Sequence, residues 1–273
     1  MQLIVDAASK GMSLKRFLVA RFPGLSQYYL RSRVHRGLCT INHEPADWGR
    51  KLRGGERIEI EVDLEAENAR RPEDLPLEVV FENADLLAVN KAPGMLVHPT
   101  KHTKSGTLAN AIAHYLKGGR FWFVHRLDRD TSGLLVVAKT AAATHRLAKL
   151  WAAREVKKQY QARLAGQIKA HSFFIQAPIG RAEGRSPQWA IDPAGKPAQT
   201  SGEVLASNAQ NTLVALEPIT GRTNQLRLHC AYLGHPIDGD VLYGGTSAER
   251  LYLHAAKLEV EGLNFAAPCP FSL

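Results

Sequence analysis

Two carboxylates and two guanidinium groups crowd a short polar segment near the middle of the chain. The segment begins where an apolar stretch stops at His125, and it precedes a continuous apolar run at 134–138. That run is short and rich in β-branched residues, which predicts a buried strand directly after a polar loop. Within the loop, Asp128 has Arg126 and Arg129 close in sequence, and nearby cations favour an ionised carboxylate. Such an aspartate is a candidate nucleophile facing a phosphate-bearing substrate. A charged turn whose ion pairs only pin the loop is the alternative.

Longer blocks of sequence distinguish between these two interpretations. Residues 125–133, His-Arg-Leu-Asp-Arg-Asp-Thr-Ser-Gly, resemble the catalytic signature of the RluA-type pseudouridine synthases. Five further blocks resemble the same family and follow in its order, at 157–162, 195–200, 221–229, 234–240 and 253–255. The resemblance runs from about Leu77 to near the C-terminus. One short motif can arise by chance, whereas five ordered blocks at family-like spacing indicate a real relationship.

The resemblance implies an RNA-modifying isomerase that uses no cofactor. Pseudouridine formation breaks the bond between ribose and a base nitrogen, turns the uracil, and rejoins it through a ring carbon. No electrons or groups enter or leave, so no cofactor is expected. The target atom is hidden in stacked RNA, so the nucleotide has to be extruded into a pocket. The site must therefore supply a nucleophile or base and a pocket that holds the uracil.

The resemblance assigns catalysis to three residues. It makes Asp128 the essential carboxylate in preference to Asp130, and it leaves open whether Asp128 attacks the ribose or removes a ribose proton. Tyr160 lies in a segment of alternating polarity and is predicted to face inward with Ala162. There it could stack on the uracil and take part in proton transfer; a core tyrosine is the alternative. Arg227 is implied to pair with Asp128 through a bidentate contact that keeps the carboxylate ionised.

Four further residues of this region are predicted to bind the substrate. Arg126 is expected either to fill the gap left by the flipped base, as its counterpart does in the family, or to form a plain ion pair with Asp130. Arg129 is expected to contact RNA, and Arg222 to contact a phosphate or a loop. Asn224 stands where the family usually has histidine. An amide can form hydrogen bonds but cannot become cationic, so the chain departs from the family at this position.

The bulk properties of the chain favour an anionic partner. Its 273 residues carry a formal net charge of +9, and a hydrophobic content of 45% is ordinary for a globular protein. No run approaches the ~20 apolar residues that span a bilayer, so we expect nucleic acid and no membrane. The N-terminus lacks the apolar segment of a signal peptide. Three distant cysteines (Cys39, Cys230 and Cys269) suit a reducing compartment and have no zinc-ligand spacing. We expect a cytoplasmic monomer without a metal.

Charge divides the chain into a basic module, a linker and a catalytic domain. Residues 10–60 hold eleven Lys or Arg against four Asp or Glu, a net charge of +7. Residues 61–90 hold two against nine, a net charge of −7. The polar, proline-ended stretch at 64–76 is predicted to be a linker. It would join an RNA-binding module over 10–63 to a catalytic domain over 77–273.

The basic module is predicted to contain two short helices followed by two short strands. The side chains expected to contact RNA are Lys15 and Arg16 on the first helix and Arg31 and Arg33 on the second. This pattern resembles the RNA-binding module named after a small-subunit ribosomal protein, although Ser26 is followed by Gln27 where that module usually has arginine. The alternative is a solvated basic surface on an ordinary small domain.

The rest of the chain predicts an α+β fold, a mixed, largely antiparallel sheet with flanking helices, preceded by the small αβ module. Predicted strands cover 77–82, 86–90, 134–138, 159–164, 200–205, 212–216 and 251–260. Predicted helices cover 107–116, 140–155 and 223–233, and a surface loop is predicted at 181–197. Successive strands without regular helix alternation favour antiparallel pairing.

These observations predict an enzyme that isomerises specific uridines in RNA. The basic module favours bacterial large-subunit ribosomal RNA as the substrate, with a tRNA as the second option. A catalytically inactive RNA-binding or ribosome-assembly protein is an alternative from another class. Such a protein has no chemical reason to retain Asp128, Tyr160 and Arg227 together. A metal-dependent nuclease is disfavoured because the metal-ligating residue types are not clustered.

Overall fold

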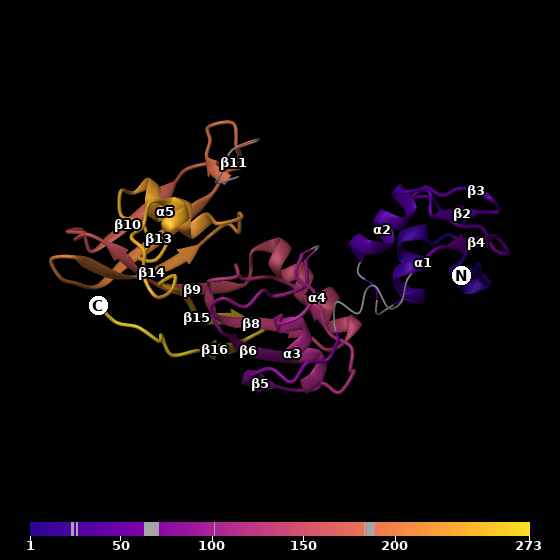
Figure 1. The fold of residues 1–273 in the computed structure, drawn as a ribbon, viewed down its shortest axis with the longest axis horizontal. Helices are drawn as coiled ribbons and strands as arrows, with labels where there is room; N and C mark the ends of the chain where they lie inside the picture. The colour runs from indigo at the N-terminus through magenta and orange to yellow at the C-terminus, as the bar shows by residue number, and fades with distance from the viewer. Residues whose placement is uncertain (23–24, 26, 63–70, 101, 183, 185–188) are drawn as a thin grey trace. The chain divides into compact units, whose positions relative to one another are not determined.

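The chain divides after Arg71 into two units, Met1–Arg71 and Pro72–Leu273, in a computed structural model (Figure 1). The structure describes residues 1–273 except 23–24, 26, 63–70, 101, 183 and 185–188. The first half of the predicted linker and the predicted helix cap Ser26 therefore lie outside the described residues. Glu73, near the other end of the linker, accepts a hydrogen bond from the Gly106 backbone N–H at 2.9 Å. This part of the predicted linker thus belongs to the second unit.

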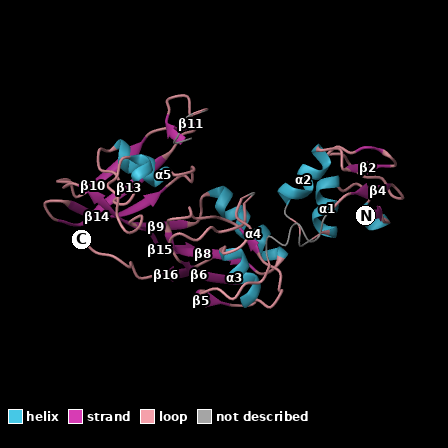
Figure 2. Cartoon of the chain, viewed as in Figure 1, coloured by secondary structure: helices cyan, strands magenta, loops and turns pink. Residues whose placement is uncertain are grey.

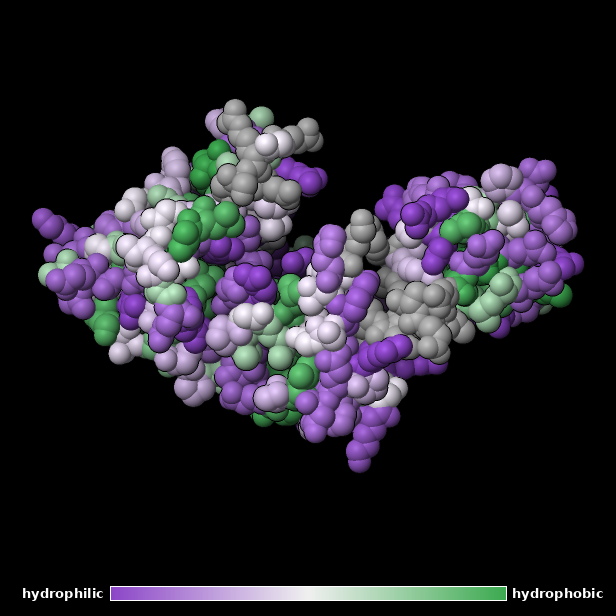
Figure 3. Space-filling view, viewed as in Figure 1, coloured by the Kyte–Doolittle hydropathy of each residue, from purple (hydrophilic) through white to green (hydrophobic). Residues whose placement is uncertain are grey.

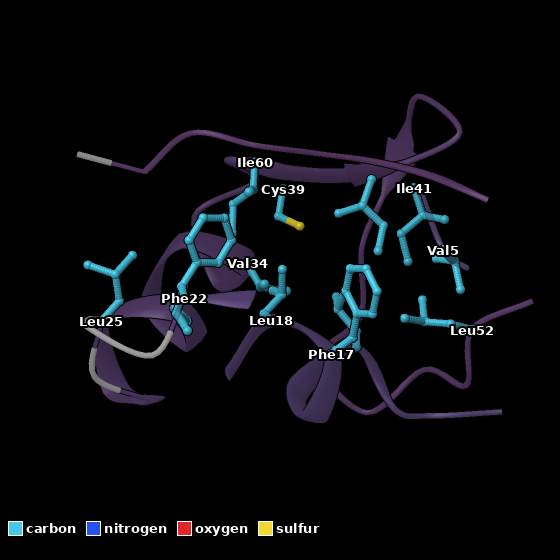
Figure 4. Close-up of a cluster of buried hydrophobic side chains, with 13 residues drawn as sticks. Val5, Phe17, Leu18, Phe22, Leu25, Val34, Cys39, Ile41, Leu52 and Ile60 are labelled. Atoms are coloured by element: carbon cyan, nitrogen blue, oxygen red, sulfur yellow. The ribbon is translucent and has the colours of Figure 1, made fainter. Parts of the chain in front are cut away.

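Two helices and a small antiparallel sheet form the first unit. The helices are α1 (Leu14–Arg21) and α2 (Gln27–His35), and the strands pair in the order β1 (Gln2–Ile4), β4 (Arg57–Ile60), β2 (Cys39–Ile41), β3 (Glu44–Pro45). The Ser13 hydroxyl caps α1 by accepting a hydrogen bond from the Arg16 backbone N–H. Phe17 and Leu18 of α1 are buried against Ile41 and Ile60 of the sheet (Figure 4). These contacts bury the apolar face of the helix and leave its basic face exposed.

The first strand was not predicted from the sequence. β1 is only three residues long, and it pairs with β4 through Leu3 and Ile58. The sheet therefore includes residues that lie before the predicted start of the module at residue 10. A strand this short carries too few residues for a reliable alternation of polar and apolar positions.

A long sheet forms the frame of the second unit (Figure 2). The strands that the structure describes pair in the order β10 (Ser172–Gln176), β13 (Gln199–Ser207), β14 (Asn211–Pro218), β9 (Lys157–Ala165), β15 (Leu253–Val260), β8 (Ser132–Ala138), β6 (Leu86–Lys91), β5 (Glu78–Glu82). In addition, β7 (Trp122–Phe123) pairs with β8, and β16 (Leu263–Ala266) pairs with β15. Only β8 and β15 run parallel among these pairs. The prediction of a mixed, largely antiparallel sheet is confirmed.

Strand β8 is buried on both faces, as its continuous apolar sequence predicts. Successive side chains of a strand point to opposite faces. Val136 packs in one cluster with Leu147 of α4 (Ala141–Ala153), whereas Val137 packs in another with Ile112 of α3 (Leu108–Tyr115). The two helices therefore cover opposite faces of the sheet. The start of α4 is fixed by Thr140, whose hydroxyl accepts a hydrogen bond from the Ala143 backbone N–H.

Two predictions for the second unit need correction. The predicted surface loop 181–197 contains strand β12 (Trp189–Ile191), which forms a hairpin with β11 (Ile179–Arg181). Three-residue strands separated by Gly, Pro and Arg leave little alternating pattern in the sequence. The predicted helix over 223–233 is α5 (Gln225–Tyr232), which begins two residues later than expected. No helix in the described ranges is long and apolar enough to cross a membrane.

Candidate functional site

A cavity of about 340 Å³ opens where strand β8 begins. The loop before β8 contributes Asp128 to its wall, β9 contributes Tyr160, and α5 contributes Arg227. The three residues predicted to be catalytic span 99 positions of the sequence, from 128 to 227, and the fold brings all three to one cavity. Arg126, Arg222 and Asn224 line the same cavity, whereas Arg129 is not among its lining residues.

A glycine at the second position of β8 permits the close approach of this strand to β15. Gly133 pairs with Ala255 in the parallel contact of β8 with β15, and its φ is +110°. A Cβ at this position would lie 2.4 Å from the Ala255 carbonyl oxygen. No other residue fits without moving a backbone. The last residue of the sequence signature is thus required by packing between strands.

A buried lysine holds the loop from the other side. Lys91 ends β6, its side chain is 1% exposed, and its Nζ donates to the carbonyl oxygens of Ala92 (2.8 Å), Met95 (2.9 Å) and Arg129 (2.9 Å). Burial lowers the pKa of Lys91 to about 8, against the opposing effect of Asp130 and Asp128. Lys91 thus ties the end of β6 to the loop that carries Asp128.

The Asp128 carboxyl is half-buried beside the cavity. Burial raises its pKa, and Asp240 adds to this effect, while Arg227, Arg126 and Lys91 oppose it. The sequence predicted that Arg126 and Arg129 favour the ionised carboxylate. Arg126 does so, whereas Arg129 is turned toward Asp130, and desolvation outweighs the nearby cations. No described residue donates a hydrogen bond to the Asp128 side chain, so both oxygens are available to a substrate.

Arg227 makes its bidentate contact with Asp240 instead of Asp128. Its Nε lies 2.7 Å from Asp240 Oδ2 and its Nη2 lies 2.6 Å from Asp240 Oδ1. The Asp240 side chain is fully buried and that of Arg227 is 13% exposed. Arg227 also lies over the ring of Tyr243, 4.9 Å from its centre. The expected direct pairing with Asp128 is therefore wrong; Arg227 acts on Asp128 through its charge alone.

The two arginines of the loop, Arg126 and Arg129, differ in their contacts. Arg129 pairs with Asp130, with Nε and Nη2 donating to the two carboxylate oxygens at 2.9 and 3.1 Å. Asp130 is thus occupied and the alternative that Arg126 is its partner is wrong. Arg126 is exposed at the cavity mouth and has no hydrogen bond or ion pair with the residues that the structure describes. Its guanidinium is therefore free to bind a substrate.

Tyr160 connects the cavity with the core. Its ring packs against two buried clusters, one that includes Leu135 and Val137 and one that includes Leu226 and Leu253. Burial raises the pKa of its hydroxyl, and the nearby Asp128 raises it further, so the phenol stays protonated. The predicted inward orientation is confirmed. A neutral hydroxyl next to a carboxylate can donate a hydrogen bond, and its raised pKa makes it a weak acid.

An amide missed by the sequence interpretation organises the start of α5. Gln225 is 4% exposed, its Oε1 accepts from Thr220 Oγ1 (2.6 Å) and from the Arg222 backbone N–H (3.0 Å), and its Nε2 donates to the Gln199 carbonyl oxygen (2.8 Å). These bonds tie the helix to strand β13 and to the cavity loop. The residue lies in the family-like block 221–229, which was the only sequence signal for it.

The two polar residues before Gln225 make protein contacts in this structure. The Arg222 Nε donates to the Pro197 carbonyl oxygen at 3.0 Å, which matches the predicted loop contact. Asn224 has a φ of 54°, a left-handed conformation that asparagine tolerates well, and its Nδ2 donates to the Tyr243 hydroxyl at 2.8 Å. Because Tyr243 also carries Arg227 on its ring, Asn224 supports the Arg227–Asp240 pair indirectly.

A histidine and a tryptophan form one wall of the cavity. The rings of His125 and Trp151 are stacked, with centres 4.6 Å apart and planes inclined by 20°. His125 Nε2 accepts a hydrogen bond from the Val136 backbone N–H at 2.9 Å, which requires this nitrogen to be unprotonated. Burial lowers the pKa of His125 to about 3. The first residue of the signature is therefore neutral and structural.

Three of the four basic residues of the first unit that the sequence predicted to contact RNA are exposed. Lys15, Arg16 and Arg31 are exposed, and the visible face of this unit is largely hydrophilic (Figure 3). Arg33 is half-buried: its Nη2 donates to the Tyr29 hydroxyl at 2.7 Å, and its guanidinium lies 4.6 Å from the centre of that ring. Arg33 is thus engaged within its own helix and is the least suited of the four to bind RNA.

Metal ligands do not cluster in the described part of the chain. Within it, no group of three or more His, Cys, Asp or Glu side chains could hold a metal ion. The three cysteines are free thiols, and Cys39 and Cys230 are buried. Carboxylate, guanidinium and hydroxyl groups are among the side chains that line the cavity.

Comparison with known proteins gives one consistent result. The family model described as RNA pseudouridylate synthase matches residues 85–232. Ribosomal large subunit pseudouridine synthase D of Yersinia pestis is 35% identical over 246 residues, covering 88% of this chain and 75% of that protein. The protein of the same name from Vibrio parahaemolyticus is 34% identical over 293 residues, covering 97% and 90%. Among solved structures, human RNA Pseudouridylate Synthase Domain Containing 1 is 32% identical with a TM-score of 0.65, covering 73% of this chain and 86% of that one.

Proposed function

Because this chain belongs to the RNA pseudouridylate synthase family, we propose that it isomerises specific uridines of large-subunit ribosomal RNA with Asp128 as its essential carboxylate. The observation that carries the proposal is the meeting of Asp128, Tyr160 and Arg227 at one cavity. The choice of ribosomal RNA over tRNA is supported by the names of the curated relatives. A ribosomal RNA substrate is in keeping with the predicted cytoplasmic location, and the monomeric state stays a prediction.

The cavity has the chemistry that a flipped uridine requires. Its apolar wall includes Leu226, Leu253 and the Tyr160 ring, against which a uracil could stack. Its polar wall presents the Asp128 carboxylate without a competing donor. A negatively charged oxygen that accepts no hydrogen bond from the described protein residues is free either to attack the ribose or to remove a ribose proton. The contacts favour neither of these two roles.

The charges around Asp128 set the conditions under which it can react. Burial disfavours the ionised carboxylate, and Arg227 and Arg126 favour it. Two hydrogen bonds to Asp240 fix the position of the Arg227 guanidinium, so its positive charge is held in place near Asp128. We therefore assign Arg227 a positioning and electrostatic role, and Arg126, which has no partner among described residues, a role in holding the RNA around the extruded nucleotide.

The first unit would deliver the RNA. Lys15, Arg16 and Arg31 are exposed on its two helices and can contact phosphates without reading sequence. We assign no catalytic role to this unit because every candidate for chemistry lies after residue 71.

A pair of neighbouring aspartates provides the direct test. Asp128→Asn should abolish isomerisation and leave RNA affinity nearly unchanged, because affinity rests on many phosphate contacts. Asp130→Asn is the matched control: it lies in the same loop, pairs with Arg129, and does not line the cavity. It should keep turnover within a few fold of wild type. Residual turnover of Asp128→Asn within tenfold of wild type would reject Asp128 as the essential carboxylate.

Chemical mapping of pseudouridine in total RNA, with and without the gene, tests the substrate. The proposal expects one or more sites to disappear from large-subunit ribosomal RNA. Loss confined to a tRNA would favour the second substrate, and loss of no site in any RNA would contradict the proposal.

A further inference from the structure

A second cavity adjoins the first. It has a volume of about 490 Å³ and lies between the end of α4, the start of β9 and the segment that follows β14. The two cavities share part of their walls, including Trp151, Lys158, Pro218 and Arg222. A polymer that placed one nucleotide in the first cavity would therefore run past these side chains on its way to the second.

Lys158 lies in the shared wall and has no partner there. It is two residues before Tyr160 on β9, so both side chains point to the same face of the sheet. Its side chain is half-buried, and burial lowers the pKa of its ammonium. No hydrogen bond or ion pair connects its ammonium to any of the described residues. A partly buried cation without a hydrogen-bond acceptor lowers the free energy of unfolding. This cost is explained if an anion of the substrate binds the cation during function.

The remaining walls of the second cavity suit a nucleotide. Val156, Pro218 and Ile219 offer apolar surface, and the Ile219 side chain is exposed although it is a large hydrophobic group. Arg154 follows the last residue of α4 in a left-handed conformation with a φ of 62°, is exposed, and its side chain also forms no hydrogen bond or ion pair with the residues described. Apolar faces for a base beside unpaired cations for a phosphate are the two elements of single-strand recognition.

We propose that the second cavity is a subsite for the nucleotide next to the target uridine, and that Lys158 binds the phosphodiester joining the two. This inference rests on the proposed function, because it requires an RNA strand whose target nucleotide enters the first cavity. It adds a residue and a cavity to which no role has been assigned. Lys158 here is a binding residue; it is not required for the chemical step itself.

The test removes the charge from each side of the contact. Lys158→Gln should lower kcat/KM on a single-stranded RNA by about tenfold or more, as expected for loss of a charge-assisted hydrogen bond. The salt slope of binding should fall by about 0.7. Lys158→Arg should retain most of the activity. Lys149→Gln is the matched control, since Lys149 is exposed on α4 and lines neither cavity. It should behave as wild type.

Substrates with an uncharged methylphosphonate at the linkage on either side of the target uridine complete the cycle. One of these substrates should lower the kcat/KM of the wild type as much as Lys158→Gln lowers it on the unmodified RNA. The same substrate should not lower the kcat/KM of the Lys158→Gln variant any further. Full additivity at both linkages, or equal behaviour of Lys158→Gln and Lys149→Gln, would overturn the proposal. Circular dichroism melting checks that the variant folds. If the wild type isomerises no RNA, the proposed function fails. The same pairs of variants and substrates, compared by their RNA affinity in an Asp128→Asn background, then still test the subsite.

Discussion

The Arg227–Asp240 pair provides the sharpest test of how the site is built. Arg227→Ala would leave the Asp240 carboxylate fully buried without the two hydrogen bonds that now satisfy it. Removing one partner of a buried pair costs about 3–5 kcal/mol, because an uncompensated charge remains. For a unit of this size each kcal/mol lowers the melting temperature by roughly 2–4 °C, so the catalytic unit should melt about 6–20 °C earlier.

Differential scanning calorimetry measures this effect as a shift of the unfolding transition. Arg222→Ala is the control: it removes an arginine of the same cavity whose guanidinium has a single backbone acceptor. It should shift the transition by only a few degrees. Adding Asp240→Asn to Arg227→Ala removes the unpaired charge and should recover part of the stability, since residues that touch each other couple by about 0.5–3 kcal/mol. Recovery would identify the buried charge, and not the missing packing of Arg227 on Tyr243, as the main cause.

The same variant makes a separate prediction for catalysis. Arg227 is the first of the groups that lower the pKa of Asp128, so its removal should raise that pKa further. Turnover that depends on the ionised carboxylate falls as pH drops through this pKa. The acidic limb of the pH–rate profile should thus move to higher pH in Arg227→Ala. A variant that melts like wild type and keeps the wild-type pH profile would refute both the structural and the electrostatic role.

Three further predictions concern other parts of the molecule. Tyr160→Phe should lower turnover by about 100-fold if the hydroxyl transfers a proton, with RNA affinity unchanged; wild-type turnover would mean that the ring only stacks. A chain starting at Pro72 keeps the Glu73 hydrogen bond with Gly106 and should still isomerise RNA at saturating RNA concentration. Its salt slope of binding should fall by roughly 0.7–0.9 for each phosphate that the first unit would have neutralised. An unchanged slope would mean that the first unit does not bind RNA. Because the native pKa of His125 is about 3 and its ordinary value is 6.5, only the unfolded state takes up this proton between these values, so thermal stability should fall as pH drops below about 6.5. His125→Gln, whose carbonyl can still accept from Val136, should flatten that dependence, and an unaltered pH profile of melting would contradict the assignment.

The elements that could be predicted are those with strong local signals. Strand β8 is a continuous β-branched run, and α4 begins at a threonine that caps it, so both were placed to within two residues. Among the elements that were missed, β1, β11 and β12 have three residues each and β3 and β7 have two, whereas β10 (five residues) and β16 (four residues) were missed although they are longer. The two- and three-residue strands are too short to show an alternation of polar and apolar positions. Such strands are stabilised by hydrogen bonds to neighbouring strands, and the sequence of a short segment does not indicate which neighbours it will have.

The candidate site was predictable in its membership but not in its contacts. The signature and its ordered blocks identified Asp128, Tyr160 and Arg227, which the fold brings to one cavity. The partner of Arg227 could not be predicted from the sequence, because both Asp128 and Asp240 lie in family-like blocks and the spacing of the blocks does not distinguish between them. Asp240 was present in the block 234–240 without an assigned role. Which carboxylate a guanidinium takes depends on the turn after α5, where Tyr243 and Asp240 meet Arg227.

That choice of partner has a chemical consequence. A bidentate contact between Arg227 and Asp128 would place donors on both oxygens of the carboxylate and lower its reactivity toward ribose. With Asp240 taking the two hydrogen bonds, Arg227 stays fixed and acts on Asp128 only through its charge. Asp128 thereby keeps its oxygens open to the cavity, and its pKa is raised because the carboxyl is buried. A second, unreactive aspartate is thus needed for the first to be reactive, and we expect Asp240→Asn to impair turnover although Asp240 does not line the cavity.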